Sequence, residues 1–245
     1  MIPVTWTFPM KSFCRILATL FLGSLVCGFG AAPQPNSSDA CSMECVLKKM
    51  DDAAANFHTT QADFVWDQYQ RVVDETDRQK GTVYYRRAGK EIEMMAEIKE
   101  PDRKFVLYKD GKLQVYQPMM EQVIVYPGGG NHNEIESYLV LGFGGSGQDL
   151  TKSFEVSYQG EETIDNIATA KLQLIPKSEK ARDYFPKILL WIDLSRGISV
   201  QQQLMQGQGD YRLAKYSAIR LNGKIGNEVF RLKTTGKTQF VSPRG

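Results

Sequence analysis

The sequence contains few of the residue types on which most hydrolytic and metal sites are built. Its 245 residues include two histidines, His58 and His132, and four cysteines. There is no Gly-x-Ser-x-Gly motif, so a Ser-His-Asp triad has few ways to form. No pair of carboxylates stands out by its spacing either. These absences argue against a metal site and leave a secreted hydrolase as a distant third interpretation, behind two kinds of binding protein.

Long apolar runs are absent after the first thirty residues. Within them, Lys11 and Arg15 precede an uncharged run from Ile16 to Phe29, and Gly28, Gly30, Ala31 and Ala32 supply small residues at its end. A membrane-spanning helix needs about 20 apolar residues, whereas a shorter run after basic residues is typical of a secretory signal. We therefore predict a signal peptide over residues 1–30, cleaved near residue 30, and export to the periplasm.

Two other interpretations of this N-terminus were weighed. A retained N-terminal anchor is the main alternative to cleavage, and the short apolar run disfavours it. A lipoprotein signal needs a small residue immediately before the modified cysteine, but Cys27 follows Leu25-Val26. Cleavage after Gly30 or Ala31 fits better, because Pro33 would obstruct a cut directly before it.

An excess of charge of either sign is also lacking in the expected mature chain. Without Lys11 and Arg15 it has 28 basic and 28 acidic residues. Nucleic-acid binding requires a basic stripe that displaces counterions, so no nucleic-acid partner is expected. Only Cys41 and Cys45 remain after cleavage, and the sequence favours a disulfide between them and two free thiols equally. An oxidising compartment favours it, but on a helix this spacing lies near the upper end of disulfide geometry.

Residues 31–40 have the composition of a flexible linker, and 41–245 are expected to form a single domain. Between Cys41 and Phe57, apolar residues recur at the spacing of one face of an amphipathic helix: Val46, Leu47, Met50, Ala53, Ala54 and Phe57. A second, short helix is predicted over Glu134–Leu141. The following Gly142–Gly147 formally matches a dinucleotide loop, but no βαβ pattern surrounds it, so no cofactor is expected.

The rest of the chain alternates with a period of two. The clearest case is Glu91–Lys99, where Ile92, Met94, Ala96 and Ile98 form an apolar face and the other face is charged except for Met95. This is typical of a strand with one dry and one wet side. Asp110-Gly111 and Asn222-Gly223 are turn signals, and a last strand is expected at Val229–Leu232. Eleven or twelve strands with short connections predict an antiparallel meander, curled into a barrel or half-barrel.

Residues 101–126, PDRKFVLYKDGKLQVYQPMMEQVIVY, resemble the bacterial outer-membrane lipoprotein carrier (LolA-like) family. The matching features are Pro101 before a strand, the Asp110-Gly111-Lys112 turn, the aromatic-Pro step ending at Pro118, and Glu121-Gln122-Val123. Weaker likenesses lie at Gln61–Phe64, Gly81–Arg87 and Leu139–Val156, so that the resemblance covers roughly residues 42–241. It departs at Ala88, where the family has proline.

The resemblance implies a mainly β (α+β) fold. This is an incomplete antiparallel β-barrel of about 11 strands, with an N-terminal helix and a short helical lid over an apolar cavity. The implied function is a monomeric, non-enzymatic periplasmic carrier of lipoprotein acyl chains, which takes cargo from an inner-membrane lipoprotein-releasing transporter to an outer-membrane receptor. A sensor or binding module of the same fold for another apolar ligand, of the sigma-factor-regulator type, is the alternative.

Two sets of site residues follow from the pattern and the resemblance. The family places its cavity on the strand of Glu91–Lys99, so the ligand is expected on its dry face. Arg87 matches an arginine that hydrogen-bonds the lid in the carriers, so it is the expected latch. The predicted cavity lining is Phe64, Trp66, Met94, Ala96, Ile98 and Leu107.

Overall fold

The computed structural model describes residues 41–89, 91–126, 141 and 143–242. The predicted signal peptide, the linker, His132 and nearly all of the predicted helix at Glu134–Leu141 lie outside these residues. The chain divides into two units, Met1–Ser38 and Asp39–Gly245, and the description below concerns the second.

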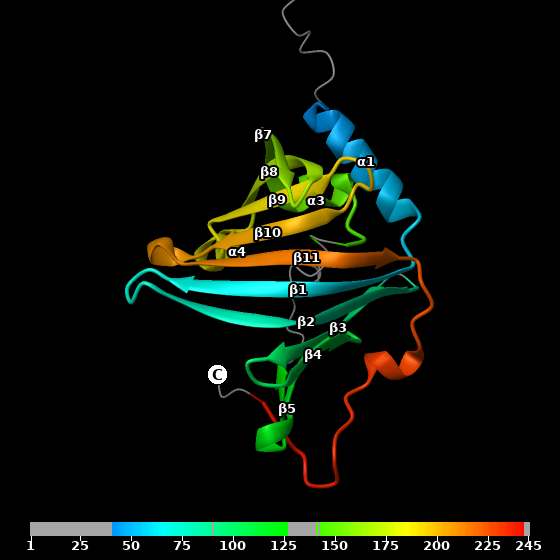
Figure 1. Cartoon of the computed structure of the whole chain (residues 1–245), viewed down its shortest axis with the longest axis vertical. Coiled ribbons are helices and arrows are strands. Elements are labelled where there is room, and N and C mark those ends of the chain that lie inside the picture. The colour runs from blue at the N-terminus through cyan, green and yellow to red at the C-terminus, as the bar shows by residue number, and fades with distance from the viewer. Residues whose placement is uncertain (1–40, 90, 127–140, 142, 243–245) are drawn as a thin grey trace, which may run out of the picture. The chain divides into compact units, whose positions relative to one another are not determined.

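Twelve strands form a single open sheet in this unit (Figure 1). Its order is β12-β6-β5-β4-β3-β2-β1-β11-β10-β9-β8-β7, so two meanders meet where β1 pairs with β11. All neighbours are antiparallel except β12, which runs parallel to β6. The strands are β1 (Thr59–Gln70), β2 (Glu75–Ala88), β3 (Glu91–Glu100), β4 (Lys104–Lys109), β5 (Lys112–Gln117), β6 (Gln122–Tyr126), β7 (Phe154–Ile164), β8 (Ile167–Pro176), β9 (Lys187–Asp193), β10 (Ser199–Met205), β11 (Tyr211–Leu221) and β12 (Gln239–Val241).

The described helices are short. They are α1 (Met43–Ala55), α3 (Gly147–Ser153) and α4 (Glu179–Tyr184), with 3-10 turns η1 (Pro118–Met120), η2 (Gly207–Gly209) and η3 (Asn227–Phe230). Within this part of the chain, no helix combines the length and apolar character that a membrane crossing needs. The expected fold class, an incomplete antiparallel barrel with an N-terminal helix, is confirmed, with twelve strands in place of about eleven.

Helix α1 lies within the predicted range, Cys41 to Phe57, and is shorter at both ends. The Ser42 side chain accepts a hydrogen bond from the Cys45 N–H and caps the first turn. The Asn56 amide donates to the Asp52 carbonyl at the other end. Val46 and Met50, on the apolar stripe, are buried against side chains of β8 and β9 that include Leu172 and Leu190.

The sheet has an inner face, which α1 covers, and an outer face. Register places Trp66, Ala214, Gln202, Leu190 and Leu172 in one row on the inner face, across five neighbouring strands. The outer face of β3 was expected to be wet except at Met95, and this holds only at the two ends of the strand, where Glu91 and Lys99 are exposed. Met95 and Glu93 on that face are 3% and 6% exposed, respectively.

The reason is the C-terminal segment, residues 222–242, which packs on the outer face of β3 and β4 through η3. It runs down beside the strands and returns to the edge of the sheet as β12 (Figure 1). Phe230 in η3 is fully buried and packs with Met95 and Leu107. The strand predicted at Val229–Leu232 is therefore wrong, because these apolar residues cover the sheet from outside. A short apolar run does not by itself distinguish a strand from such a cover.

Candidate ligand site beneath helix α1

Five of the six predicted lining residues come together on the inner face. Phe64, Met94, Ala96 and Ile98 are buried in one apolar cluster, and Trp66 packs against it. The rings of Phe64 and Trp66 stack with centroids 4.2 Å apart. Gly81 lies between Phe64 and Ile98 in the register. A Cβ there would come within 2.8 Å of the Phe64 ring, so glycine lets the ring lie flat on the sheet.

Leu107 does not belong to this set. It pairs with Met95, not Met94, and therefore lies on the outer face with Phe230. The prediction counted Leu107 with the dry face of β3, but which residues of two strands share a face depends on their register. Sequence alternation shows which residues of one strand belong together and leaves that register open.

The inner-face cluster also contains two buried tyrosines. Tyr85 and Tyr216 are 5% and 8% exposed, and their hydroxyl groups hydrogen-bond to each other. Burial raises the pKa of both well above the ordinary tyrosine value. Phe143 contacts both rings, with centroid distances of 5.2 and 5.1 Å. The segment before α3 is thus anchored on this cluster through an aromatic side chain.

The open space among the described residues lies beside this cluster, beneath the end of α1. It is a cavity of about 150 Å³. Its apolar wall includes Met50, Phe57, Leu141 and Ile198, and its rim includes the polar side chains of Asp52, Asn56, Arg196 and Asn222. A smaller pocket of about 30 Å³ continues along α1 and shares Met50, Leu141 and Gly145 with it. None of the six predicted residues lines either space.

Two glycines bring the backbone of α1 into close contact with the β9–β10 turn and with the start of α3. A Cβ on Gly197, in the β9–β10 turn, would lie 2.3 Å from the Lys49 carbonyl oxygen. A Cβ on Gly147, at the start of α3, would lie 2.6 Å from the Leu47 carbonyl oxygen. The backbone of α1 therefore packs directly against the backbone at Gly147 and Gly197, because glycine has no Cβ to keep the two main chains apart.

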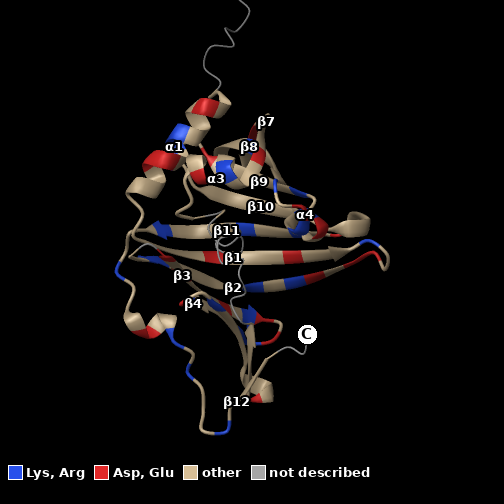
Figure 2. Cartoon of the chain, turned by 180° about the vertical axis from the view of Figure 1, so that it is seen from behind, with Lys and Arg blue, Asp and Glu red and all other residues tan. Residues whose placement is uncertain are grey.

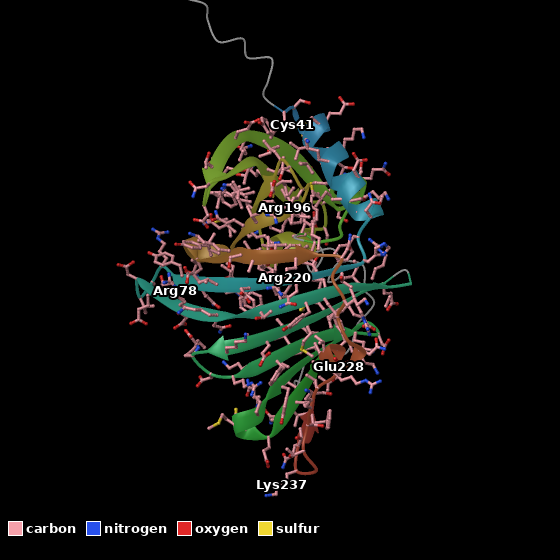
Figure 3. All side chains as sticks on the ribbon, turned by 45° about the vertical axis from the view of Figure 1, so that its right-hand side comes forward. Cys41, Arg78, Arg196, Arg220, Glu228 and Lys237 are labelled. Atoms are coloured by element: carbon pink, nitrogen blue, oxygen red, sulfur yellow. A yellow bond between two sulfur atoms is a disulfide. The ribbon has the colours of Figure 1, made fainter. Side chains whose placement is uncertain are left out.

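The β9–β10 turn is fixed by a buried carboxylate. Asp193 is 2% exposed and accepts hydrogen bonds from Ser195 and from the Arg196 guanidinium. Burial alone would raise the pKa of Asp193, but the hydrogen bonds from Ser195 and Arg196 outweigh it and lower the pKa. Arg196 is thereby held at the rim of the cavity, to the left of the lower end of α1 in Figure 3.

Arg87 bonds to both elements that cover this part of the inner face. Its guanidinium donates to the carbonyl oxygens of Ala54 at 3.5 Å, Phe57 at 3.4 Å and Gly144 at 3.2 Å. It also lies 5.7 Å from the centre of the Phe57 ring. Ala54 lies in the last turn of α1 and Phe57 lies two residues after its end, whereas Gly144 belongs to the segment before α3. The three bonds are long, and Arg87 itself is exposed.

Asn222 fixes the junction between α1 and β1. Its side-chain oxygen accepts from the N–H groups of His58 and Thr59, and its amide donates to the Asn56 carbonyl. The His58 side chain is exposed and lines neither pocket. At the other end of the helix, a disulfide joins Cys41 and Cys45, and the Cys41 N–H donates to Glu161 on β7.

Sequence reasoning missed the residues that form the cavity. Met50, Ala53 and Phe57 were identified only as the apolar stripe of a helix, Asn222 only as part of a turn, and Gly144 only as part of the glycine-rich stretch Gly142–Gly147. The signal that was available is the combination of that stripe with glycines that allow close contact. Among the described residues no cluster of three His, Cys, Asp or Glu side chains could hold a metal ion. The cavity beneath α1, with its apolar wall and polar rim, could bind a small apolar ligand.

No family model matches the chain, and no curated protein matches it. Solved structures do. An uncharacterised conserved protein from Thermus thermophilus superposes with a TM-score of 0.52 at 12% identity, over 81% of this chain and 98% of the other. A LolA superfamily protein from Nitrosomonas europaea gives 0.40 at 16% identity, over 79% and 99%.

The MucA/MucB complex of Pseudomonas aeruginosa gives a TM-score of 0.48 at 12% identity. The match covers 81% of this chain and 63% of that one, so this chain spans less than two thirds of its length. At such identities the likeness concerns the fold alone. The solved structures that match the chain include proteins named for the LolA superfamily and for lipoprotein sorting.

Proposed function

We propose that the protein is a periplasmic carrier that binds the acyl chains of lipoproteins between α1 and the inner face of its sheet. It is exported by the signal peptide of residues 1–30, and residues 41–245 form the carrier domain after a linker. The protein is a non-enzymatic monomer. It receives cargo from an inner-membrane transporter and passes it to an outer-membrane receptor.

The observation that carries this proposal is the Arg87 contact. An apolar sheet face is covered by two elements, and one exposed arginine joins both to β2 through uncharged carbonyls. Because the guanidinium is exposed and the three bonds are long, the whole latch contributes about 1 kcal/mol, less than is usual for bonds to a charged group. Each acyl methylene moved from water into an apolar site gains about 0.8 kcal/mol. A few methylenes therefore offset the loss of the latch.

The cavity volume indicates that cargo binds by opening the cover. About 150 Å³ is below the roughly 300–1,000 Å³ of ordinary ligand sites. Phe64, Trp66, Met94, Ala96 and Ile98 are buried in the closed state, and we propose that they become the cavity wall when α1 moves away. The latch then favours the closed, empty state and helps the carrier to release its cargo.

The small cavity also supports the second candidate, a periplasmic sensor or binding module for another apolar ligand. A single short apolar group fills about 150 Å³ without displacing α1, whereas several acyl chains do not. The two candidates therefore differ in whether α1 moves on binding. Hydrogen exchange of the α1 amides, with and without a triacylated peptide, distinguishes them, because only the carrier should show faster exchange when loaded.

A matched pair of variants tests whether the ligand binds in the cavity beneath α1. Ala53 lines the cavity, whereas Ala55 is exposed on the same helix. Ala53→Trp should fill the cavity and reduce binding of a triacylated peptide at least tenfold, while Ala55→Trp should bind like the original protein. Both should keep a cooperative melt. Equal binding by both folded variants would contradict the proposed site.

A further inference from the structure

Three exposed apolar side chains lie at the edge of the sheet formed by β12 and β6, opposite the β7 edge. Met119, Met120 and Phe240 are 89%, 66% and 62% exposed, respectively. The two methionines belong to η1, the turn between β5 and β6, and Phe240 belongs to β12. We call these three residues the end patch.

The backbone holds the end patch together. Phe240 pairs with Val123 of β6, and the Gln239 N–H donates to the Glu121 carbonyl, the residue directly after η1. Glu121 adopts a left-handed conformation (φ 47°), and its N–H donates back to the Pro118 carbonyl. The methionines and Phe240 therefore belong to two backbone segments that are hydrogen-bonded to each other. Because these segments are already ordered, binding costs little conformational entropy of the backbone.

The segment that leads to Phe240 is basic. Residues 222–242 contain Lys224, Arg231, Lys233 and Lys237, all exposed, against a single carboxylate, Glu228. Figure 2 shows these basic residues spread along the C-terminal segment. Lys237 lies at the same end of the sheet as η1, as Figure 3 shows. A turn fixes its position, because its N–H donates to the Thr235 hydroxyl.

We propose that the end patch and the neighbouring lysines dock on the surface of an anionic lipid bilayer. Exposed Met and Phe side chains enter the boundary between headgroups and acyl chains, while Lys233 and Lys237 lie among anionic headgroups. A protein partner fits less well, because lysine is depleted in protein interfaces and a turn offers less than the roughly 800 Å² that each partner usually buries. The proposal does not rest on the carrier function.

Flotation with lipid vesicles tests this directly. The vesicles contain either 30% phosphatidylglycerol in phosphatidylethanolamine or phosphatidylcholine alone, and the whole chain is used throughout, so that its N-terminus contributes equally to every variant. Binding should favour the anionic vesicles and weaken at high salt. Met119→Ser with Met120→Ser should lower the partition coefficient about tenfold. Lys233→Gln with Lys237→Gln should lower it about fivefold for each lysine removed.

The chain offers a matched control at a different turn. Val72 and Val73, between β1 and β2, are 81% and 55% exposed, respectively. Val72→Ser with Val73→Ser removes exposed apolar surface without touching the end patch, so this variant should float like the original protein. Circular dichroism should be unchanged in all three variants. The proposal is overturned if the methionine variant floats like the control, or if binding does not distinguish anionic from neutral vesicles.

Discussion

Two consecutive arginines on β2 secure the two faces of the sheet by different means. Successive strand residues point to opposite faces, so Arg87 meets the inner cover and Arg86 the outer one. Arg87 donates to three uncharged carbonyls at 3.2–3.5 Å. Arg86 donates to the Glu93 carboxylate at 2.5 Å, bonds to Asn227 and lies 4.2 Å from the centre of the Phe230 ring.

The difference indicates which cover can move. Arg86 is part of a charged cluster, because Lys109 also contacts Glu93, whose side chain is 8% exposed. Breaking such a buried pair leaves an uncompensated charge, which is costly. Losing the Arg87 bonds returns an exposed guanidinium and three carbonyls to water, at little cost. The C-terminal segment is therefore expected to stay on the sheet while α1 and the Gly144 segment can separate from it.

Alkaline pH should have the largest effect, on the core beneath the inner cover. The folded-state pKa values of Tyr85 and Tyr216 are raised by burial above the unfolded value of about 10. Their contribution to stability is complete below pH 10 and is lost as pH rises toward the folded values. Tyr216 alone should lose about 1.4 kcal/mol for each pH unit above 10 until its folded-state pKa is reached, and Tyr85 should add to this loss.

Urea unfolding measured between pH 8 and pH 12 checks this prediction. Tyr216→Phe should reduce the slope of stability against pH by about half, since one of the two buried hydroxyls no longer titrates. Tyr84 on the outer face also has a raised pKa through partial burial, and it contributes a smaller share. An unchanged slope in the Tyr216 variant would show that the inner-face tyrosines do not control alkaline stability.

Phe230→Ala should be the most damaging substitution in the outer cover. The side chain is fully buried between Met95, Leu107 and Arg86. Removing a buried phenylalanine costs about 3–5 kcal/mol. Phe240→Ala is the matched control, because Phe240 is 62% exposed and should cost less than about 0.5 kcal/mol. If Phe230→Ala were equally mild, the C-terminal segment would not be a fixed cover.

The two faces of β3 also show which features of the fold could be predicted from the sequence and which could not. Alternation in Glu91–Lys99 correctly grouped Met94, Ala96 and Ile98, because the period of a strand is local. It could not show that Met95 and Glu93 are covered from outside, since the cover comes from a segment more than a hundred residues later. Leu107 was misplaced for a different reason, because its face depends on its pairing with Met95 in the neighbouring strand, which alternation within one strand does not show.

Glu93→Gln should destabilise the outer cover by about 2 kcal/mol. The amide keeps the shape of the side chain but removes the charge that Arg86 and Lys109 share. Hydrogen bonds to a charged group contribute about 1.5–3 kcal/mol. Glu97→Gln is a suitable control, because Glu97 pairs with an Arg103 side chain that is 63% exposed, and exposed pairs contribute about 0–1 kcal/mol. Chemical denaturation of both variants measures the difference, and equal losses would contradict a special role for the buried pair.

Arg87→Leu should have the smallest effect on global stability, about 1 kcal/mol or less. The substitution removes three long hydrogen bonds to carbonyls at an exposed site. Its effect should instead be local. Hydrogen exchange at the end of α1 and around Gly144 should become faster, because the closed state loses part of its advantage over the open one. Exchange in η3 on the outer face should not change.

The same variant separates a latch from an ordinary surface arginine. If Arg87 favours the closed state, Arg87→Leu should bind an acylated peptide as tightly as the original protein or more tightly, and transfer it less completely to an acceptor. Arg78 lies on the same strand as Arg87, is exposed and pairs with Asp67 of β1. Arg78→Leu should change neither property. Unaltered exchange and transfer in Arg87→Leu would mean that α1 is held by its contacts at Gly147 and Gly197, and that the arginine adds nothing to the closure.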